Sequence, residues 1–331
     1  MTNAAAYSPV SSLTLQLTDS CNLGCDYCFA KDKGLNGQYI SEEDYAYFVG
    51  FCLRSGVRAI RFTGGEPMLH PHFHRFVKLA IQSRLPVHIF SNFLIPRGVK
   101  GLESPPNAIS FLVNVNDRDT YTEDEWNTLN DNLECAFKNQ YRCVLAYTVH
   151  SVAFDISHIR SLALTYHVQK IRISPAKPMI GMKNSWINNK DIKMFSETVY
   201  GLYKDLASVG IQLVLDCPIP FCHIPHDYLA FFLSSLNLSG MCTFGVSIDT
   251  NLAAGHCYIT NSLLERRSLR SFKDIFELHE YLREMIIRIE DKCQLFSECK
   301  ECSYNSQGLC SAGCYGLRFH SADHLISSHD V

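Results

Sequence analysis

The feature that most limits the fold is a regular alternation of strand and helix patterns between residues 12 and 176. Six runs rich in apolar and β-branched residues have the length of strands, and amphipathic segments separate most of them. Strands that alternate with helices are typical of parallel βα units. The strand patterns are 12–18, 59–64, 86–92, 108–116, 142–150 and 170–176, and the helical patterns are 41–56, 71–84, 123–139 and 157–166.

Six strands are too few to close an eight-stranded barrel, so the pattern predicts an α/β fold with an open, partial (β/α)6 TIM-like barrel. Beyond the sixth strand pattern the organisation changes. Residues 211–216 have a strand pattern, residues 245–258 a hairpin pattern, and residues 271–290 an apolar stripe of helical spacing. We therefore expect a barrel domain at 1–210 and a small cysteine-rich α+β extension at 211–331.

Composition and charge exclude several classes of function. The formal net charge is −3 and no basic block occurs, so the sequence has no electrostatic surface for a nucleic-acid backbone. The N-terminus has no signal-peptide pattern, and no run of about 18 apolar residues has the length of a membrane span. The chain is therefore expected to be cytoplasmic. Its 15 cysteines are many for that compartment, where disulfides rarely persist, so closely spaced cysteines predict metal binding or catalysis.

Three cysteines, Cys21, Cys25 and Cys28, lie within eight positions directly after the first strand pattern. In a parallel α/β barrel the chemistry lies at the carboxyl ends of the strands. The second strand pattern ends in TGGEP, residues 63–67, and the third ends in serine and asparagine, residues 91–92. We therefore expect the three segments to meet on one rim of the barrel.

Three thiolates are one ligand short of the four that a closed metal site usually has. If they hold a four-iron cluster, one iron stays open to a small molecule. Gly64 and Gly65 let the backbone approach that molecule, and Glu66 is expected to accept hydrogen bonds from an ammonium group. A ligand with an amino and a carboxylate group satisfies both the open iron and Glu66. The alternative is a structural zinc site with a fourth ligand elsewhere, which leaves GGEP without a role.

The order C-x3-C-x2-C, with an aromatic residue before the last cysteine and GGEP after the next strand, resembles the radical S-adenosylmethionine (radical SAM) superfamily. The resemblance covers about residues 13–176. It implies a [4Fe–4S] cluster that binds SAM through its amino and carboxylate groups and cleaves it to a 5′-deoxyadenosyl radical, which abstracts hydrogen from a substrate. The residues implied are Cys21, Cys25 and Cys28 for the cluster, and Tyr27, Gly64, Gly65, Glu66, Pro67, Ser91 and Asn92 for SAM.

The segment after the fourth strand pattern departs from this family. Radical SAM proteins commonly have a Ser-x-Asp-Gly-like run there, whereas residues 114–117 of this chain are Asn-Val-Asn-Asp. The family pattern therefore leaves the contacts of this segment open. Tyr147, His150 and Arg172 lie on or near later strand ends, where a barrel binds its substrate, and are equally compatible with packing or solvent-facing roles.

The C-terminal cysteines resemble the SPASM/twitch extension that many radical SAM enzymes carry. The motif C-x2-C-x7-C-x3-C at residues 299–314 follows a hairpin flanked by Cys242 and Cys257. The middle spacing is seven residues where the family usually has five. No cysteine follows Cys314, and Leu252 stands near the place of a turn glycine.

This extension implies one or two auxiliary iron–sulfur clusters. The family's interleaved pattern implies two sets of cluster ligands. The first set begins with Cys222 in preference to Cys217. The second set takes either Cys293 or the substrate as its fourth ligand. A single auxiliary cluster or a zinc ribbon is the alternative. The first set is Cys222, Cys242, Cys257 and Cys314, and the second is Cys293, Cys299, Cys302 and Cys310.

The sequence thus predicts a radical SAM oxidoreductase or maturase whose substrate is a peptide or protein side chain. A small molecule, such as a sugar, an aminoglycoside or a cofactor precursor, is the alternative substrate. From another class, a non-catalytic iron–sulfur electron carrier would bind metal without cleaving SAM. An electron donor such as flavodoxin or ferredoxin is an expected partner. Because only about a dozen residues precede the first strand, we expect any peptide leader to need a separate binding protein.

Overall fold

The computed structural model describes residues 12–28, 36–105, 107–180, 183–236, 238–242, 245–292 and 296–322. The strands of the sheet are β1 (Ser12–Thr18), β2 (Ala59–Gly64), β3 (Val87–Ser91), β4 (Ile109–Asn114), β5 (Arg142–Val149), β6 (Lys170–Pro175), β7 (Gln212–Leu215), β8 (Ser247–Ile248) and β9 (Ala254–Gly255). The α-helices of the described part are α1 (Glu42–Arg54), α2 (Phe73–Gln82), α3 (Glu123–Lys138), α4 (Ser157–Thr165), α5 (Ile192–Ser208), α6 (His226–Ser235), α7 (Ile275–Lys292), α8 (Ser303–Ser306) and α9 (Tyr315–Ala322).

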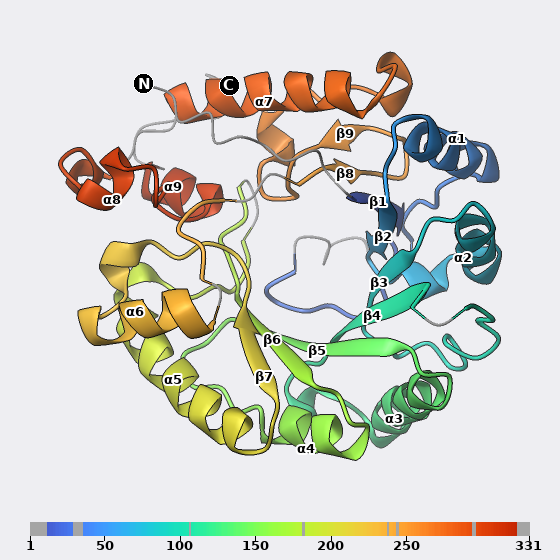
Figure 1. Ribbon diagram of the computed structural model, residues 1–331, viewed down its shortest axis with the longest axis horizontal. Helices are drawn as coiled ribbons and strands as arrows, with labels where there is room; N and C mark the ends of the chain where they lie inside the picture. The colour runs from blue at the N-terminus through green and yellow to red at the C-terminus, as the bar shows by residue number, and fades with distance from the viewer. Residues whose placement is uncertain are drawn as a thin grey trace.

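The sheet has nine strands in the order β7-β6-β5-β4-β3-β2-β1-β8-β9. Each neighbouring pair is parallel except β8 and β9, which are antiparallel. The sheet curls, α1 to α6 lie on its outer side, and β7 and β9 form its two edges (Figure 1). This architecture confirms the predicted α/β fold with an open, partial barrel. The predicted strands and helices up to residue 176 all occur, with their ends shifted by a few residues.

The sheet continues beyond the predicted domain boundary at residue 210. β7 pairs in parallel with β6, and Ile171 lies opposite Leu213. β8 pairs in parallel with β1 on the other side of the barrel, and Thr14 lies opposite Ser247. Two strands that the sequence pattern assigned to the extension therefore belong to the same sheet as the barrel. The division of the chain at residue 210 stays a prediction.

The burial pattern along the strands shows which faces of the sheet are packed. Leu13, Leu15 and Leu17 of β1 are fully buried, and their side chains share one face of a strand that lies inside the sheet. β2, β3 and β4 alternate buried and half-buried positions. This alternation is expected for strands that press one face against helices and turn the other toward the barrel interior.

The helix starts follow local sequence signals. Ser41 caps α1, because its hydroxyl accepts a hydrogen bond from the N–H of Asp44 at 3.0 Å. The sequence pattern did not predict α5 or α6. Gly201 lies inside α5 and weakens its helical pattern, whereas α6 follows Pro225, which occupies its N-cap position.

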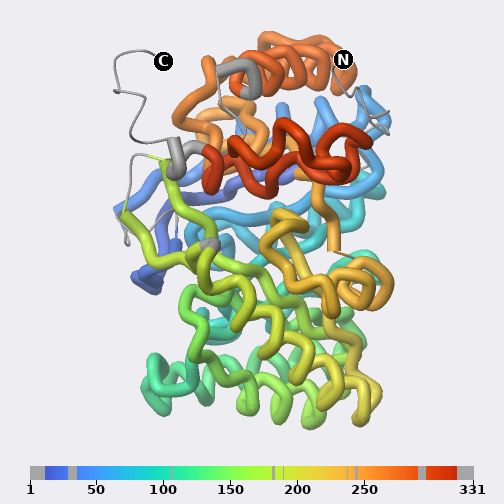
Figure 2. The backbone as a smooth tube through the Cα atoms, turned by 90° about the vertical axis from the view of Figure 1, so that its left-hand side faces the viewer, coloured from blue at the N-terminus to red at the C-terminus, as the bar shows by residue number. Residues whose placement is uncertain are grey.

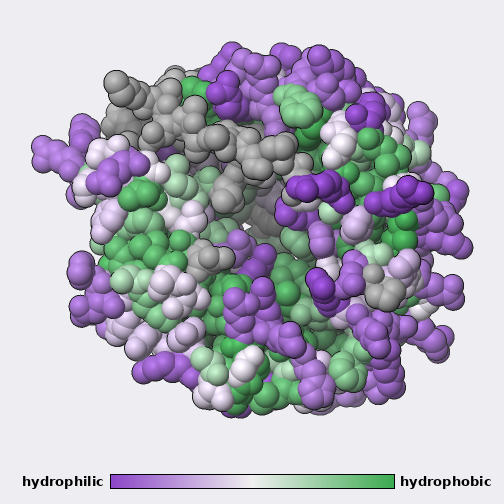
Figure 3. Space-filling model, in the orientation of Figure 1, coloured by the Kyte–Doolittle hydropathy of each residue, from purple (hydrophilic) through white to green (hydrophobic). Residues whose placement is uncertain are grey.

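The two ends of the sheet lie close to the C-terminal part of the chain. Figure 2 shows the C-terminal segments, coloured orange to red, at one end of the molecule and α3 to α5 at the other. The face seen in Figure 1 is hollowed near its centre (Figure 3). Among the helices of the described residues, none combines the length and the apolar character that crossing a membrane requires.

Candidate active site

The carboxyl ends of β1 to β4 bring the predicted site segments to one rim. These strands are consecutive parallel neighbours, so their ends meet at the same edge of the sheet. Two backbone hydrogen bonds fasten the first two loops together. The N–H of Gly65 donates to the carbonyl oxygen of Thr18, and that of Glu66 donates to the carbonyl oxygen of Ser20, both at 2.8 Å. The loop that carries the cysteines is therefore anchored to the loop after β2.

Gly64 and Gly65 make this anchoring possible. A Cβ on Gly64 would lie 2.1 Å from the carbonyl oxygen of Thr18, and one on Gly65 would lie 2.0 Å from that of Ser20. Gly64 also has a φ of 154°, which side-chain-bearing residues rarely adopt. The structure thus gives the two glycines a role that the sequence did not predict, which is to let the backbone before Cys21 approach β2. Their predicted contact with a small molecule stays a proposal.

The three cysteines of the first motif are in no disulfide and lie within electrostatic reach of one another. The N–H of Cys28 donates to the carbonyl oxygen of Cys25 at 3.0 Å, which closes the loop into a turn. Burial raises the pKa of Cys21 to about 11, and the charges of Glu66, Cys28 and Cys25 add to this rise. Metal binding would therefore have to displace protons from this loop.

Glu66 links the end of β2 to the end of β3. Its carboxylate is buried and accepts hydrogen bonds from the Ser91 hydroxyl and the N–H of Asn92 at 2.8 Å, and from the N–H of Met68 at 3.0 Å. Burial raises the pKa of Glu66 to about 7, although these hydrogen bonds oppose the rise. The Asn92 amide in turn donates to the side-chain oxygen of Asn22 at 2.9 Å. Glu66 thus positions the loop around Asn92, and its predicted contact with an ammonium group stays a prediction.

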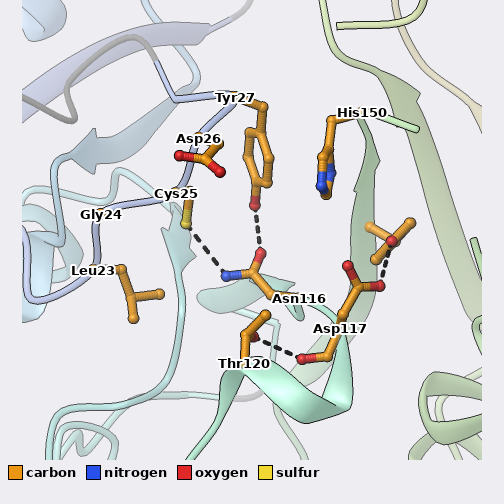
Figure 4. A pocket seen from close by; sticks show the side chains of 10 residues that line it. Leu23, Gly24, Cys25, Asp26, Tyr27, Asn116, Asp117, Thr120 and His150 are labelled. Carbon is orange, nitrogen blue, oxygen red and sulfur yellow. Dashed lines mark hydrogen bonds between the residues drawn. The ribbon is translucent and has the colours of Figure 1, made fainter. Parts of the chain in front are cut away.

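The segment after β4 contacts the cysteine loop directly. The amide of Asn116 donates to the sulfur of Cys25 at 3.3 Å, and its oxygen accepts a hydrogen bond from the Tyr27 hydroxyl (Figure 4). The amide of Asn114 donates to the same hydroxyl at 2.9 Å. Burial first, then the nearby charge of Cys25, raises the pKa of Tyr27. The sequence did not lead us to predict Asn116 as a site residue. The signal that could have indicated it is its position at a strand end, in a run that departs from the family pattern.

A cavity of about 250 Å³ opens beside this loop (Figure 4). The ring of His150 lies 5.3 Å from that of Tyr27, between centroids, and forms part of its wall. The Tyr147 hydroxyl donates to the carboxylate of Asp117 at 2.5 Å. Residues of three strand ends line the cavity, which are Leu23, Gly24, Cys25, Asp26, Tyr27, Asn116, Asp117, Thr120, Tyr147 and His150.

Two of the three residues noted near later strand ends therefore belong to this cavity. Tyr147 and His150 line it, whereas Arg172 forms an ion pair with Asp216 at 3.1 Å. Within the described residues, no group of three or more His, Cys, Asp or Glu side chains is arranged to hold a single metal ion. A cluster of four irons spaces its thiolate ligands more widely than one ion does, and three neighbouring thiols outside disulfides are the donor set that such a cluster uses.

Seven of the remaining cysteines form two groups around the C-terminal segment. We call Cys299, Cys302 and Cys310 the C-terminal triplet. The turn Phe221–His223 packs against the segment that carries the triplet. Cys222 is exposed as a residue, and partial loss of hydration raises the pKa of its thiol, to which the charges of the three triplet thiols add. The predicted grouping of Cys222 with the hairpin cysteines stays a prediction.

Cys217, Cys257 and Cys314 form the second group. Burial raises the pKa of Cys217, and the charges of Cys314 and Cys257 contribute to this rise. Cys242 packs against a small apolar cluster of Ile286, Ile289 and Tyr315, the residue after Cys314. Cys293, the predicted fourth ligand of the other set, lies outside the described residues.

Comparison with known proteins identifies the first part of the chain. Residues 15–119 match the family model of the Radical SAM superfamily. The chain carries a radical SAM domain. The matched segment contains the loop with Cys21, Cys25 and Cys28, the Gly64–Gly65 turn and Asn116.

Curated proteins resemble this chain over part of their length. A probable GTP 3′,8-cyclase of Methanocella arvoryzae is 33% identical over 115 residues, which are 34% of this chain and 37% of that protein. The sporulation killing factor maturation protein SkfB of Bacillus subtilis is 33% identical over 110 residues, which are 33% of this chain and 25% of that protein. The chain thus spans well under half the length of these relatives.

Solved structures share the fold over nearly the whole chain. Streptococcus suis SuiB bound to S-adenosylmethionine has a TM-score of 0.66 at 14% identity, and the alignment covers 92% of this chain and 73% of SuiB. The protein anSMEcpe, with bound AdoMet and the Cp18Cys peptide, has a TM-score of 0.62 at 17% identity, with 93% and 89% covered. The similarity therefore includes most of the part that follows the radical SAM domain.

Proposed function

We propose that the chain is an enzyme that cleaves SAM at a [4Fe–4S] cluster held by Cys21, Cys25 and Cys28. The observation that carries the proposal is the geometry of the rim, where the Gly64–Gly65 turn packs against the cysteine loop and a cavity opens beside Cys25. When bound, the cluster and SAM supply a 5′-deoxyadenosyl radical that abstracts a hydrogen atom from the substrate. The protein supplies orientation of the reactants and exclusion of water.

The residues around the cavity have separate tasks in this proposal. Asn116 donates a hydrogen bond to the sulfur of Cys25, and such bonds tune the reduction potential of a cluster. Tyr27 is held by its hydrogen bonds to Asn114 and Asn116, and it forms the wall of the cavity on the side of the cluster. The Tyr147–Asp117 pair lines the same cavity and faces the substrate.

We propose a peptide or protein side chain as the substrate. Support comes from proteins that share the fold over 92% of this chain, since SuiB was solved with its precursor peptide SuiA and anSMEcpe with the Cp18Cys peptide. SkfB, a maturation protein by name, supports the same class. The proposal includes a cytoplasmic location, an electron donor such as flavodoxin or ferredoxin, and a separate leader-binding protein. It also includes one or two auxiliary iron–sulfur clusters at the C-terminal cysteines.

A small-molecule substrate is the second candidate. Its support is the set of curated relatives named GTP 3′,8-cyclase, for example those of Chlorobaculum tepidum and Synechocystis sp., at 37% and 36% identity over 71 and 78 residues. A non-catalytic iron–sulfur carrier is the alternative of another class. It would bind iron and leave SAM intact.

The first test is release of 5′-deoxyadenosine. The chain is purified without oxygen, reconstituted with iron and sulfide, and incubated with SAM and dithionite. We expect release by the native chain and by Cys135→Ala, whose cysteine lies on α3 away from the rim, and no release by Cys25→Ala. A fully iron-loaded native chain that leaves SAM intact, even with candidate substrates present, would support the electron-carrier alternative.

A second test separates the substrate classes. The active chain is incubated with peptides encoded beside its gene and, separately, with GTP. We expect a mass change in a peptide, read by mass spectrometry, and unchanged GTP. Conversion of GTP without any peptide product would overturn the peptide proposal in favour of the small-molecule one.

A further inference from the structure

The C-terminal triplet needs a fourth ligand if it holds a cluster that is closed by protein thiolates. Cys299 and Cys310 are buried, and Cys302 is half-buried. The N–H of Cys302 donates to the carbonyl oxygen of Cys299 at 3.3 Å, so the first two triplet cysteines share one tight turn. The triplet is therefore a compact group of thiols in the interior of the C-terminal segment.

The turn Phe221–His223 lies against this segment, although about 80 residues separate the two in the sequence. The ring of Phe221 meets that of Tyr304 edge-on, with centroids 5.4 Å apart. Tyr304 lies between two members of the triplet, and its carbonyl oxygen accepts a hydrogen bond from the N–H of Cys310 at 3.2 Å. On the other side of the turn, the ring of His223 lies 6.4 Å from that of Phe296. Both neighbours of Cys222 thus contact residues that flank the triplet.

Gly240 holds the turn in this place. A Cβ on Gly240 would lie 2.6 Å from the ring of Phe221. Gly240 also pairs with Cys310 in a β-bridge, and its carbonyl oxygen accepts a hydrogen bond from the N–H of Ser311 at 2.9 Å. The backbone that carries Cys310 and the ring next to Cys222 are therefore both packed against one glycine. The charges of all three triplet thiols act on Cys222 in agreement with this arrangement.

Cys217 lies within electrostatic reach of the other group, because the charges of Cys314 and Cys257 act on its thiol. Its φ is 66°, an uncommon conformation for a residue other than glycine, and it lies five positions before Cys222. The amine of Lys177 donates to the carbonyl oxygen of Pro218 at 3.1 Å and so fixes the residue after Cys217. Gly313, with a φ of 80°, packs against Pro220, since a Cβ there would lie 2.7 Å from the proline ring. The segment 217–222 thus spans the two cysteine groups.

We propose that Cys222 is the fourth ligand of a [4Fe–4S] cluster held by the C-terminal triplet, and that Cys217 takes its place beside Cys257 and Cys314. The inference rests on the proposed auxiliary clusters and changes the ligand set predicted from the family's spacing. A cluster closed by four thiolates has no iron open to the substrate. The triplet cluster would then serve electron transfer, and Cys293 would not be needed as a ligand.

The test uses a chain in which Cys21, Cys25 and Cys28 are all alanine, so that only auxiliary clusters bind iron. The first background adds Cys257→Ala and Cys314→Ala and leaves the triplet cluster. The second background instead adds Cys299→Ala and Cys302→Ala and leaves the other cluster. Iron and sulfide per chain and the low-temperature EPR spectrum of the reduced protein are then measured.

In the first background we expect Cys222→Ala to lower the iron content from about 4 per chain or to change the EPR spectrum, and Cys217→Ala to do neither. In the second background we expect Cys217→Ala to lower the iron content or to change the EPR spectrum, and Cys222→Ala to do neither. Cys135→Ala serves as the matched control in both, and circular dichroism reports folding. Cys222→Ser is the second variant, because it keeps the size of the side chain and should still change the spectrum of the first background.

The proposal is overturned if Cys222→Ala and Cys222→Ser leave the first background unchanged, or if they alter the second background. It is also overturned if the chain without the first three cysteines takes up no iron, because no auxiliary cluster then exists. That failure leaves the proposed SAM cleavage untouched, since 5′-deoxyadenosine release by the native chain tests it separately.

Discussion

Glu66 is a buried carboxylate that holds two loops together. All three of its hydrogen bonds come from the ends of β2 and β3, and it anchors the loop of Asn92, which reaches Asn22 in the cysteine motif. An acidic residue in GGEP predicts a ligand contact from sequence. The structure adds a positioning role, which acts on the cysteine loop even before any ligand binds.

The raised pKa of Glu66 predicts a pH dependence of folding. Between its ordinary value of 4.5 and about 7, the folded chain keeps a proton that the unfolded chain releases. The free energy of unfolding of the metal-free chain should therefore fall as pH rises through this window, by up to about 3 kcal/mol, and level off above it. Urea unfolding of the native chain and of Glu66→Gln from pH 5 to 8 measures this contribution, which the variant should lack.

Glu43→Gln is the matched control for this experiment, because the carboxylate of Glu43 is exposed on α1. It should follow the pH profile of the native chain. Parallel profiles for the native chain and Glu66→Gln would show that Glu66 does not titrate in this window.

At the scale of elements, the site depends on how closely the loop after β1 approaches the turn after β2. Gly65→Ala would place a methyl group against the carbonyl oxygen of Ser20 and force the backbone before Cys21 to move. We expect this variant to lose about 1–3 kcal/mol of stability, as in other overpacked sites, and to bind less iron at the first motif. Thermal unfolding, and the iron content of a chain that lacks the C-terminal triplet together with Cys257 and Cys314, report the two effects.

Gly24→Ala is the control within the same motif, because a Cβ on Gly24 meets no atom within 4 Å. It lies between Cys21 and Cys25 and should leave iron binding and stability close to native. Equal losses in both variants would mean that the motif does not tolerate any substitution, and the close approach at Gly65 would not be the cause.

The sequence predicted elements well where a local pattern decides them. The strands and helices predicted up to residue 176 rest on local patterns of apolar residues, and they all occur. The contact of Asn116 with Cys25 depends on where the end of β4 meets a loop about 90 residues away. The neighbourhood of Cys222 depends on the packing of Phe221 against Tyr304. Such long-range packing leaves no signal in residue spacing.

At the scale of the whole molecule, one sheet joins the barrel to the cysteine-rich part. β7 pairs with β6 at one side and β8 pairs with β1 at the other, so segments from both sides of residue 210 share backbone hydrogen bonds. The hydrophobic core also runs from Leu13 through β7 to Leu282 of α7 and Cys310. Elements that share a sheet and a core are expected to unfold together.

The last prediction follows from this continuity. The metal-free chain should unfold in one transition under reducing conditions, whether it is followed by tryptophan fluorescence or by thiol labelling. Trp126 and Trp186, the two tryptophans, report on the barrel, and the buried thiols of Cys299 and Cys310 report on the C-terminal part. Leu213→Ala should destabilise the chain by about 2–5 kcal/mol, because Leu213 is buried in β7, and should shift both midpoints equally. A shift of only one midpoint would show that the two parts fold separately. A shift of the thiol midpoint alone would support the division at residue 210, because Leu213 lies after it.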